Sequence, residues 1–121
     1  MTETESDEVG YLPVAEVSRR LVAALGPTLV ASLAGVKDRR APRGWAEADV
    51  TPRPRAVVRL RFAQEQWHKV AAVESEQVAR LWFVGANPWL RDNTPITAIR
   101  EGRFDEVATA VQALLDNSFD C

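Results

Sequence analysis

Apolar residues recur at intervals of three and four positions along most of this chain, and they do not alternate with polar residues over four or more positions. Intervals of three and four place side chains on one face of an α-helix, whereas alternation would indicate a half-buried β-strand. The pattern therefore predicts an all-α protein. The most regular run lies near the end of the chain and consists of Phe104, Val107, Ala108, Val111, Leu114 and Leu115.

Prolines and glycines divide this pattern into short helices, because proline fits the first turn of a helix and glycine commonly follows the last. The predicted helices span residues 13 to 25, 28 to 34, about 38 or 41 to 48, 54 to 73, 76 to 84, 94 to 102 and 104 to 115. Ser75 is a natural N-cap for the helix that follows it. On the longest helix, the predicted inner stripe consists of Val57, Leu60, Gln64, Trp67 and Ala71.

The length of 121 residues suits one small domain, and the single cysteine, Cys121, excludes a disulfide within the chain. The longest charge-free stretch, residues 21–36, is broken by Gly-Pro and falls short of the roughly 20 apolar residues that span a bilayer. The acidic start is unlike a signal peptide. We therefore expect a cytoplasmic protein with no membrane partner, and a disordered acidic tail over residues 1–12.

The net charge of −2 conceals a strongly uneven distribution of charge. Residues 37–61 hold eight lysines and arginines against three acids, a net charge of +5. Residues 1–8 and 62–121 each carry −4. Clustered arginines are typical of proteins that bind phosphate backbones, although a solvated surface is the alternative.

The stretch from Leu21 to Trp45 matches a helix-turn-helix arrangement: two short helices, a turn at Gly35, a small Ala31 in the first helix and Trp45 in the second. In that arrangement the second helix enters the major groove, and Trp45 anchors it to the core. A helical hairpin with a solvated, arginine-rich turn would show the same pattern. The predicted DNA-binding residues are Arg39, Arg40, Arg43, Arg53 and Arg55.

A second segment, residues 81–90, carries three aromatic side chains. Trp82 stands four positions after Val78 and is expected to pack inward. Trp89 follows the Asn87-Pro88 turn and is harder to bury. Core packing explains part of this pattern, but aromatic side chains near a turn are also typical anchors for a protein partner.

Residues that could carry catalysis are scarce. His68 is the only histidine, no second ligand stands at zinc-binding spacing, and no glycine-rich phosphate loop is present. We expect no enzymatic activity, no catalytic residue, no metal and no cofactor.

The chain resembles the Xre/MbcA/ParS family of bacterial antitoxins. Over about residues 55–121, the similarity is to the toxin-binding domain of that family, and residues 31–52 resemble its Xre-like helix-turn-helix. The chain departs from the family by placing Pro42 and Gly44 inside the expected recognition helix. The matching positions are Ala79-Arg80-Leu81-Trp82, Gly85-Ala86-Asn87-Pro88, Leu90, Thr94-Pro95, Ile99, Gly102 and Val107 in the second part, and Ala31, Leu33, Gly35, Val36, Trp45 and Pro52 in the first.

This resemblance implies a partner, a RES-domain toxin that degrades NAD, whose active site the antitoxin blocks. It also implies a homodimer within a larger toxin–antitoxin complex, which binds operator DNA and represses its own operon. Residues 13–54 would be the DNA-binding part, and residues 55–121 the toxin-binding domain, which includes an inhibitory tail at 116–121. The implied toxin-binding residues are Trp82, Asn87, Pro88, Trp89, Asn117, Ser118, Phe119 and Asp120.

An alternative interpretation is a stand-alone helix-turn-helix transcriptional regulator whose second half dimerises or senses a ligand.

Overall fold

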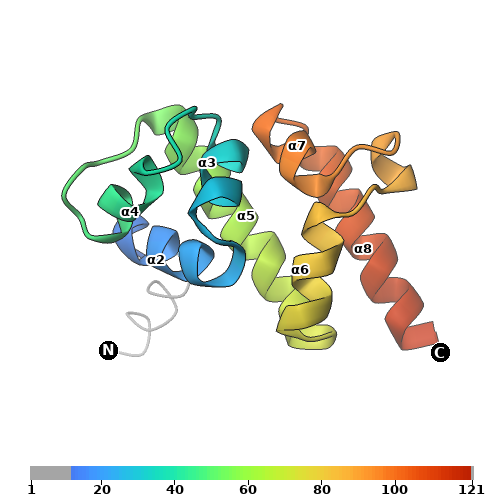
Figure 1. The fold of residues 1–121 in the computed structure, drawn as a ribbon. Helices are drawn as coiled ribbons and strands as arrows, with labels where there is room; N and C mark the ends of the chain where they lie inside the picture. The colour runs from blue at the N-terminus through green and yellow to red at the C-terminus, as the bar shows by residue number, and fades with distance from the viewer. Residues whose placement is uncertain (1–11, 121) are drawn as a thin grey trace.

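A computed structural model describes residues 12–120, with side chains up to residue 117. Apart from Leu12, the expected acidic tail lies outside the described residues. Within them every regular element is helical, which confirms the all-α prediction (Figure 1). The elements are α2 (Val14–Leu25), α3 (Pro27–Ala34), α4 (Ala41–Ala46), α5 (Pro54–Val73), α6 (Glu76–Val84), the 3-10 helix η1 (Pro88–Leu90), α7 (Pro95–Arg100) and α8 (Phe104–Asp120).

Two glycines separate the first three helices. Gly26, with φ of 88°, ends α2 and lets Pro27 open α3 at once. Gly35 ends α3 in the left-handed conformation, and its N–H donates to the Ser32 carbonyl at 3.0 Å. Only glycine adopts such positive φ angles at little cost, so the predicted helix ends occur where the sequence places these residues.

Helix α5 is the element around which the rest is arranged. It contacts α2 and α3 on one side and α6, α7 and α8 on the other (Figure 1). Its buried apolar stripe consists of Ala56, Leu60, Ala63, Trp67 and Val70. Of the predicted stripe, Leu60 and Trp67 are buried, and Ala71 is partly buried and packs against the core. Val57 and Gln64 are only partly buried.

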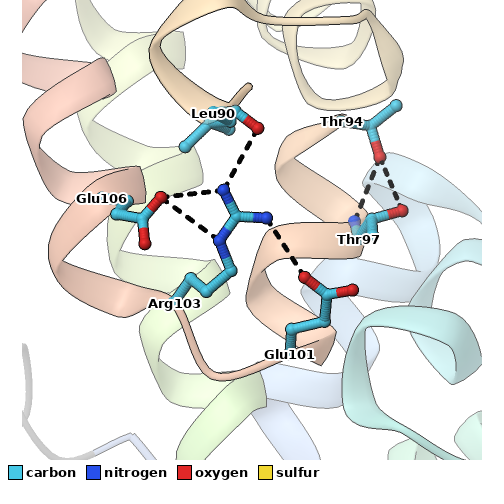
Figure 2. A network of polar contacts seen from close by, with 6 residues as sticks. All are labelled: Leu90, Thr94, Thr97, Glu101, Arg103 and Glu106. Carbon is cyan, nitrogen blue, oxygen red and sulfur yellow. Dashed lines mark hydrogen bonds and ion pairs between the residues drawn. The ribbon is translucent and has the colours of Figure 1, made fainter. Parts of the chain in front are cut away.

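Aromatic packing and two helix N-caps stabilise the second half of the chain. Phe83 of α6 is fully buried, and its ring centroid lies 5.6 Å from that of Trp67 and 5.4 Å from that of Trp82. Ser75 caps α6 as predicted, because its hydroxyl accepts the Val78 N–H at 3.0 Å. Thr94 caps α7 in the same way through the Thr97 N–H (Figure 2).

Residues from both halves belong to one continuous hydrophobic cluster that runs from Val17 to Val111. The division expected at residues 54 and 55 therefore falls within a shared core, where α5 begins. It does not separate two bodies with cores of their own.

Three boundaries differ from the prediction by two residues or more. Helix α7 ends at Arg100, not at residue 102. Helix α4 ends at Ala46, not at residue 48, because Ala48 has a positive φ of 62° and the Gly44 carbonyl accepts the Asp49 N–H instead. Residues 116–120 continue α8, so the predicted tail is helical. No helix in the described part of the chain is long and apolar enough to cross a membrane.

Leu60 provides a test of the central packing. It is fully buried in α5, so Leu60→Ala should lower the free energy of unfolding by about 2–5 kcal/mol through reduced burial and a residual cavity. Val58 lies two residues away and is 53% exposed, so Val58→Ala should change it by no more than about 0.5 kcal/mol. Denaturant unfolding measures both, and equal effects would contradict this packing.

Candidate DNA and partner surfaces

The predicted DNA-binding arginines are all exposed, and they come from three places. Arg39 and Arg40 lie in the turn before α4, and Arg43 lies on α4. Arg53 is the N-cap of α5, and Arg55 follows in its first turn. The α3–α4 connection and the start of α5 together therefore form a positively charged surface.

Helix α4 is short, and its buried residues hold it in place. Pro42 occupies its first turn and is buried, while Trp45 is 4% exposed and packs into the core, as predicted. With six residues the helix makes fewer than two turns. Of the three arginines expected on a recognition helix, only Arg43 lies within it, and the connecting turn presents the other two.

Asp38 organises that turn. Its carboxylate accepts the Arg40 N–H at 2.9 Å and also faces the Arg40 side chain at 3.4 Å. The hydrogen bond from the Arg40 backbone keeps the pKa of Asp38 below its ordinary value. The Arg40 side chain nevertheless stays 88% exposed and available for contact.

A second surface is apolar and lies on α6. Val78, Leu81 and Val84, spaced three apart along the helix, form what we call the α6 apolar face. Leu81 is 70% exposed, and the two valines are exposed as well. Single exposed leucines are ordinary, but three apolar side chains at helical spacing on one outer face are typical of an interaction surface.

The aromatic residues next to this face have different environments. Trp82 is partly buried against Phe83, as expected, whereas Trp89 on η1 is 60% exposed and Pro88 is exposed beside it. Trp89 is thus the aromatic side chain of this segment that projects into solvent.

Asn87 is buried and stabilises the turn that the sequence predicted at Asn87-Pro88. It is 7% exposed, and its side chain accepts the Trp89 N–H at 2.9 Å. Its carbonyl accepts the N–H groups of Leu90 and Asp92, both at 2.9 Å. Asn87 therefore shapes the loop from inside. Of the residues predicted to contact a toxin here, Pro88 and Trp89 are the exposed ones.

Arg103 fastens this loop to α8 (Figure 2). Its Nη2 donates to the Leu90 carbonyl at 3.1 Å and to Glu106 Oε1 at 2.8 Å, while its Nη1 donates to Glu101 Oε1 at 3.1 Å. The hydrogen bond from Arg103 holds the pKa of Glu106 below its ordinary value, and the same bond raises the pKa of Arg103. One guanidinium therefore holds η1, and with it Trp89, in place.

The remaining predicted toxin-binding residues lie at the far end of α8. Asn117 is exposed, and the side chains of Ser118, Phe119 and Asp120 lie outside the described part of the structure. Helix α8 rises about 1.5 Å per residue, so Asn117 stands roughly 20 Å along the axis from Phe104, the end near η1. The loop and the tail are therefore not brought together.

Side chains that could bind a metal do not gather in the part of the chain that the structure describes. No group of three or more histidine, cysteine, aspartate or glutamate side chains there could hold a metal ion. His68 is exposed on α5.

Sequence reasoning missed the α6 apolar face. A signal was present in the sequence, because α6 carries two apolar stripes. Ala79 and Phe83 form one and Val78 and Leu81 form the other, and a single buried face cannot hold both. It also missed Arg100, which stands outside the basic segment.

Comparison with known proteins adds no relatives: no protein-family model, no curated sequence and no solved structure matches the chain. Function must therefore be inferred from the surfaces above and from the sequence resemblance.

The Arg103–Glu106 pair gives a pH-dependent prediction. Because the folded pKa of Glu106 is depressed, its stabilising contribution should be fully present above the ordinary value of 4.5 and be lost as pH falls through the folded pKa. Glu106→Gln should therefore lower Tm at about pH 7, and the difference from the parent protein should vanish towards about pH 3.

Asp105→Asn is the matched control, because Asp105 shares the first turn of α8 and its dipole but has no bond to Arg103. If Tm falls by the same amount in both variants across the pH range, the helix dipole and not the Arg103 contact explains the effect.

Proposed function

We propose that this protein is the antitoxin of a type II toxin–antitoxin system: it binds a RES-domain, NAD-degrading toxin, blocks its active site, and represses its own operon as a DNA-binding protein. The proposal rests on the resemblance of residues 55–121 to toxin-binding domains and of residues 31–52 to an Xre-like helix-turn-helix. It includes a cytoplasmic location and a homodimer within the larger complex.

The observation that carries the proposal is the exposure of Leu81 and Trp89 on the acidic half of the chain. Residues 62–121 have a net charge of −4, and among their side chains that the structure describes these two are the most exposed large apolar ones. Apolar and aromatic anchors on a segment of net negative charge suit a partner whose pocket is lined with cations, as a pocket for nucleotide phosphates must be.

The distance between η1 and the end of α8 refines how the toxin would be engaged. Because η1 lies near the start of α8, the length of α8, about 20 Å, separates it from the tail, and two contacts that far apart cannot fill the same small pocket. We assign docking to Trp82, Pro88, Trp89 and the α6 apolar face, with Asn87 as the residue that shapes this loop. Blocking of the NAD site is assigned to the end of α8, residues 116–121, with Asn117, Ser118, Phe119 and Asp120.

Leu81→Arg tests the docking surface. It places a positive charge on the face proposed to meet an arginine-lined partner, and arginine is a good helix former, so the fold should be retained. We expect toxin binding to weaken by at least about 2 kcal/mol, roughly thirtyfold in Kd. Co-purification with the product of the adjacent gene and an NAD-consumption assay measure this effect.

Val58→Arg is the control, since Val58 is also an exposed apolar residue but lies on α5 away from the α6 apolar face. Full neutralisation by Leu81→Arg would rule out docking through α6.

Arg39, Arg40 and Arg43 provide the test of DNA binding. Replacing all three by Ala should weaken binding to the DNA upstream of the gene and reduce the slope of log K against log salt by about 0.9 for each phosphate that is no longer neutralised. A gel shift at several salt concentrations measures both quantities.

The charge-matched control replaces Arg19, Arg20 and Lys69, which are exposed outside the basic segment. The assignment of DNA binding to Arg39, Arg40 and Arg43 would be rejected if their replacement left the gel shift unchanged, or if both triple variants weakened DNA binding equally.

The runner-up is a stand-alone helix-turn-helix regulator, and the α6 apolar face is the observation that favours it, because the same face could close on a second copy of the chain. In that case Leu81→Arg would convert a dimer into a monomer in light scattering, and the adjacent gene product would not bind.

A further inference from the structure

A hollow of about 720 Å³ opens where the end of α3, the loop before α5 and the first turns of α5 meet. Four arginines line it: Arg53, Arg55 and Arg59 from the α5 region and Arg100 from α7. Volumes of about 300–1,000 Å³ are typical of small-molecule sites. The hollow thus combines the size of a ligand site with a high local positive charge.

The charge of this cluster is not neutralised within the described chain. No acidic residue lines the hollow, and none of the four arginines forms an ion pair with a described carboxylate. Among the other arginines of the described chain, Arg19, Arg20, Arg40 and Arg103 each pair with an aspartate or glutamate, and the rest form no ion pair with a described carboxylate. The hollow therefore gathers unpaired guanidinium groups in one place.

Two of these arginines are held by neutral acceptors. Arg59 Nε donates to the Arg100 carbonyl at 3.0 Å, and its Nη1 donates to the Arg55 carbonyl at 3.1 Å. Arg100 Nη1 donates to the Ser32 hydroxyl at 3.0 Å. Such bonds fix the guanidinium groups without cancelling their charge, so little ordering is left to an incoming anion.

The first turn of α5 adds to the same potential. Pro54, Arg55 and Ala56 line the hollow, and no side chain caps this helix. Free N–H groups and the positive end of the helix dipole favour an anion there. The other walls include Val36, Val50 and Pro52, which offer apolar surface beside the arginines.

We infer that this hollow binds a small phosphorylated molecule, with its phosphate groups on Arg53, Arg55, Arg59 and Arg100 and its organic part against the apolar wall. Guanidinium forks match phosphate oxygens and are the preferred side chains for binding them. A concave site with an apolar wall suits a small ligand better than the convex backbone of a DNA duplex, which contacts projecting side chains such as Arg40.

A consequence rests on the proposed function. Arg53 and Arg55 also belong to the surface proposed to bind DNA, so an occupied hollow would compete with the operator for the same two side chains. Arg100, by contrast, lies on α7 and outside that surface.

Calorimetric titration of the purified full chain with pyrophosphate and with ATP tests the inference. We expect saturable binding that falls by about tenfold or more in the double variant Arg53→Gln/Arg55→Gln, whose side chains make no hydrogen bond with described residues. Arg100→Gln should weaken binding as well. Arg19→Gln on α2 lies outside the hollow and removes one charge, as Arg100→Gln does, and should bind as the parent protein does.

Several outcomes would overturn the inference. These are the absence of saturable binding to both phosphate probes, an equal weakening with Arg19→Gln, unchanged binding with Arg100→Gln while the thermal unfolding of that variant stays cooperative, and equally tight binding of adenosine, which lacks phosphate. Binding to duplex DNA alone would assign the arginines to a DNA backbone instead. Neither toxin nor operator is present in the titration, so failure of the antitoxin proposal leaves this result intact.

Discussion

The packing of α5 is the constraint on which the rest of the structure depends. Its 20 residues supply buried side chains to both halves of the chain, and five other helices pack against it. Because the core is continuous, the basic surface at the start of α5 and the apolar surface on α6 are held by the same rigid element. Two surfaces of opposite character can then act on different partners without a linker between them.

Arg103 holds the loop around η1 in place, which apolar packing in the shared core does not do. The segment from Gly85 to Asn93 contains only one short helical turn, and its backbone must be held by specific bonds. Asn87 holds it from inside and Arg103 from the α8 side, so Trp89 remains exposed without being loose. An aromatic anchor held in this way loses little conformational entropy when a partner binds.

Much of the helical layout could be predicted, because prolines and glycines act locally: α2, α5 and α6 begin and end within a residue of their expected bounds. The end of α8 could not, since Asp116 and Asn117 are poor helix formers, yet no glycine or proline stops the helix there. Burial also depends on distant partners. The sequence of α6 has more apolar residues than one buried face can hold, but which of them are exposed depends on how α5 and α7 pack against it, and Leu81 is the most exposed of them.

The distribution of arginines separates structural from functional charge more clearly than the net charge does. Arg103 is paired with acids and satisfies a backbone carbonyl, so its charge is used inside the fold. Arg59 and Arg100 are held in place by neutral oxygens and keep their full charge towards the hollow. Concentrating unpaired cations in one hollow raises the free energy of the empty protein, and a bound anion relieves that repulsion.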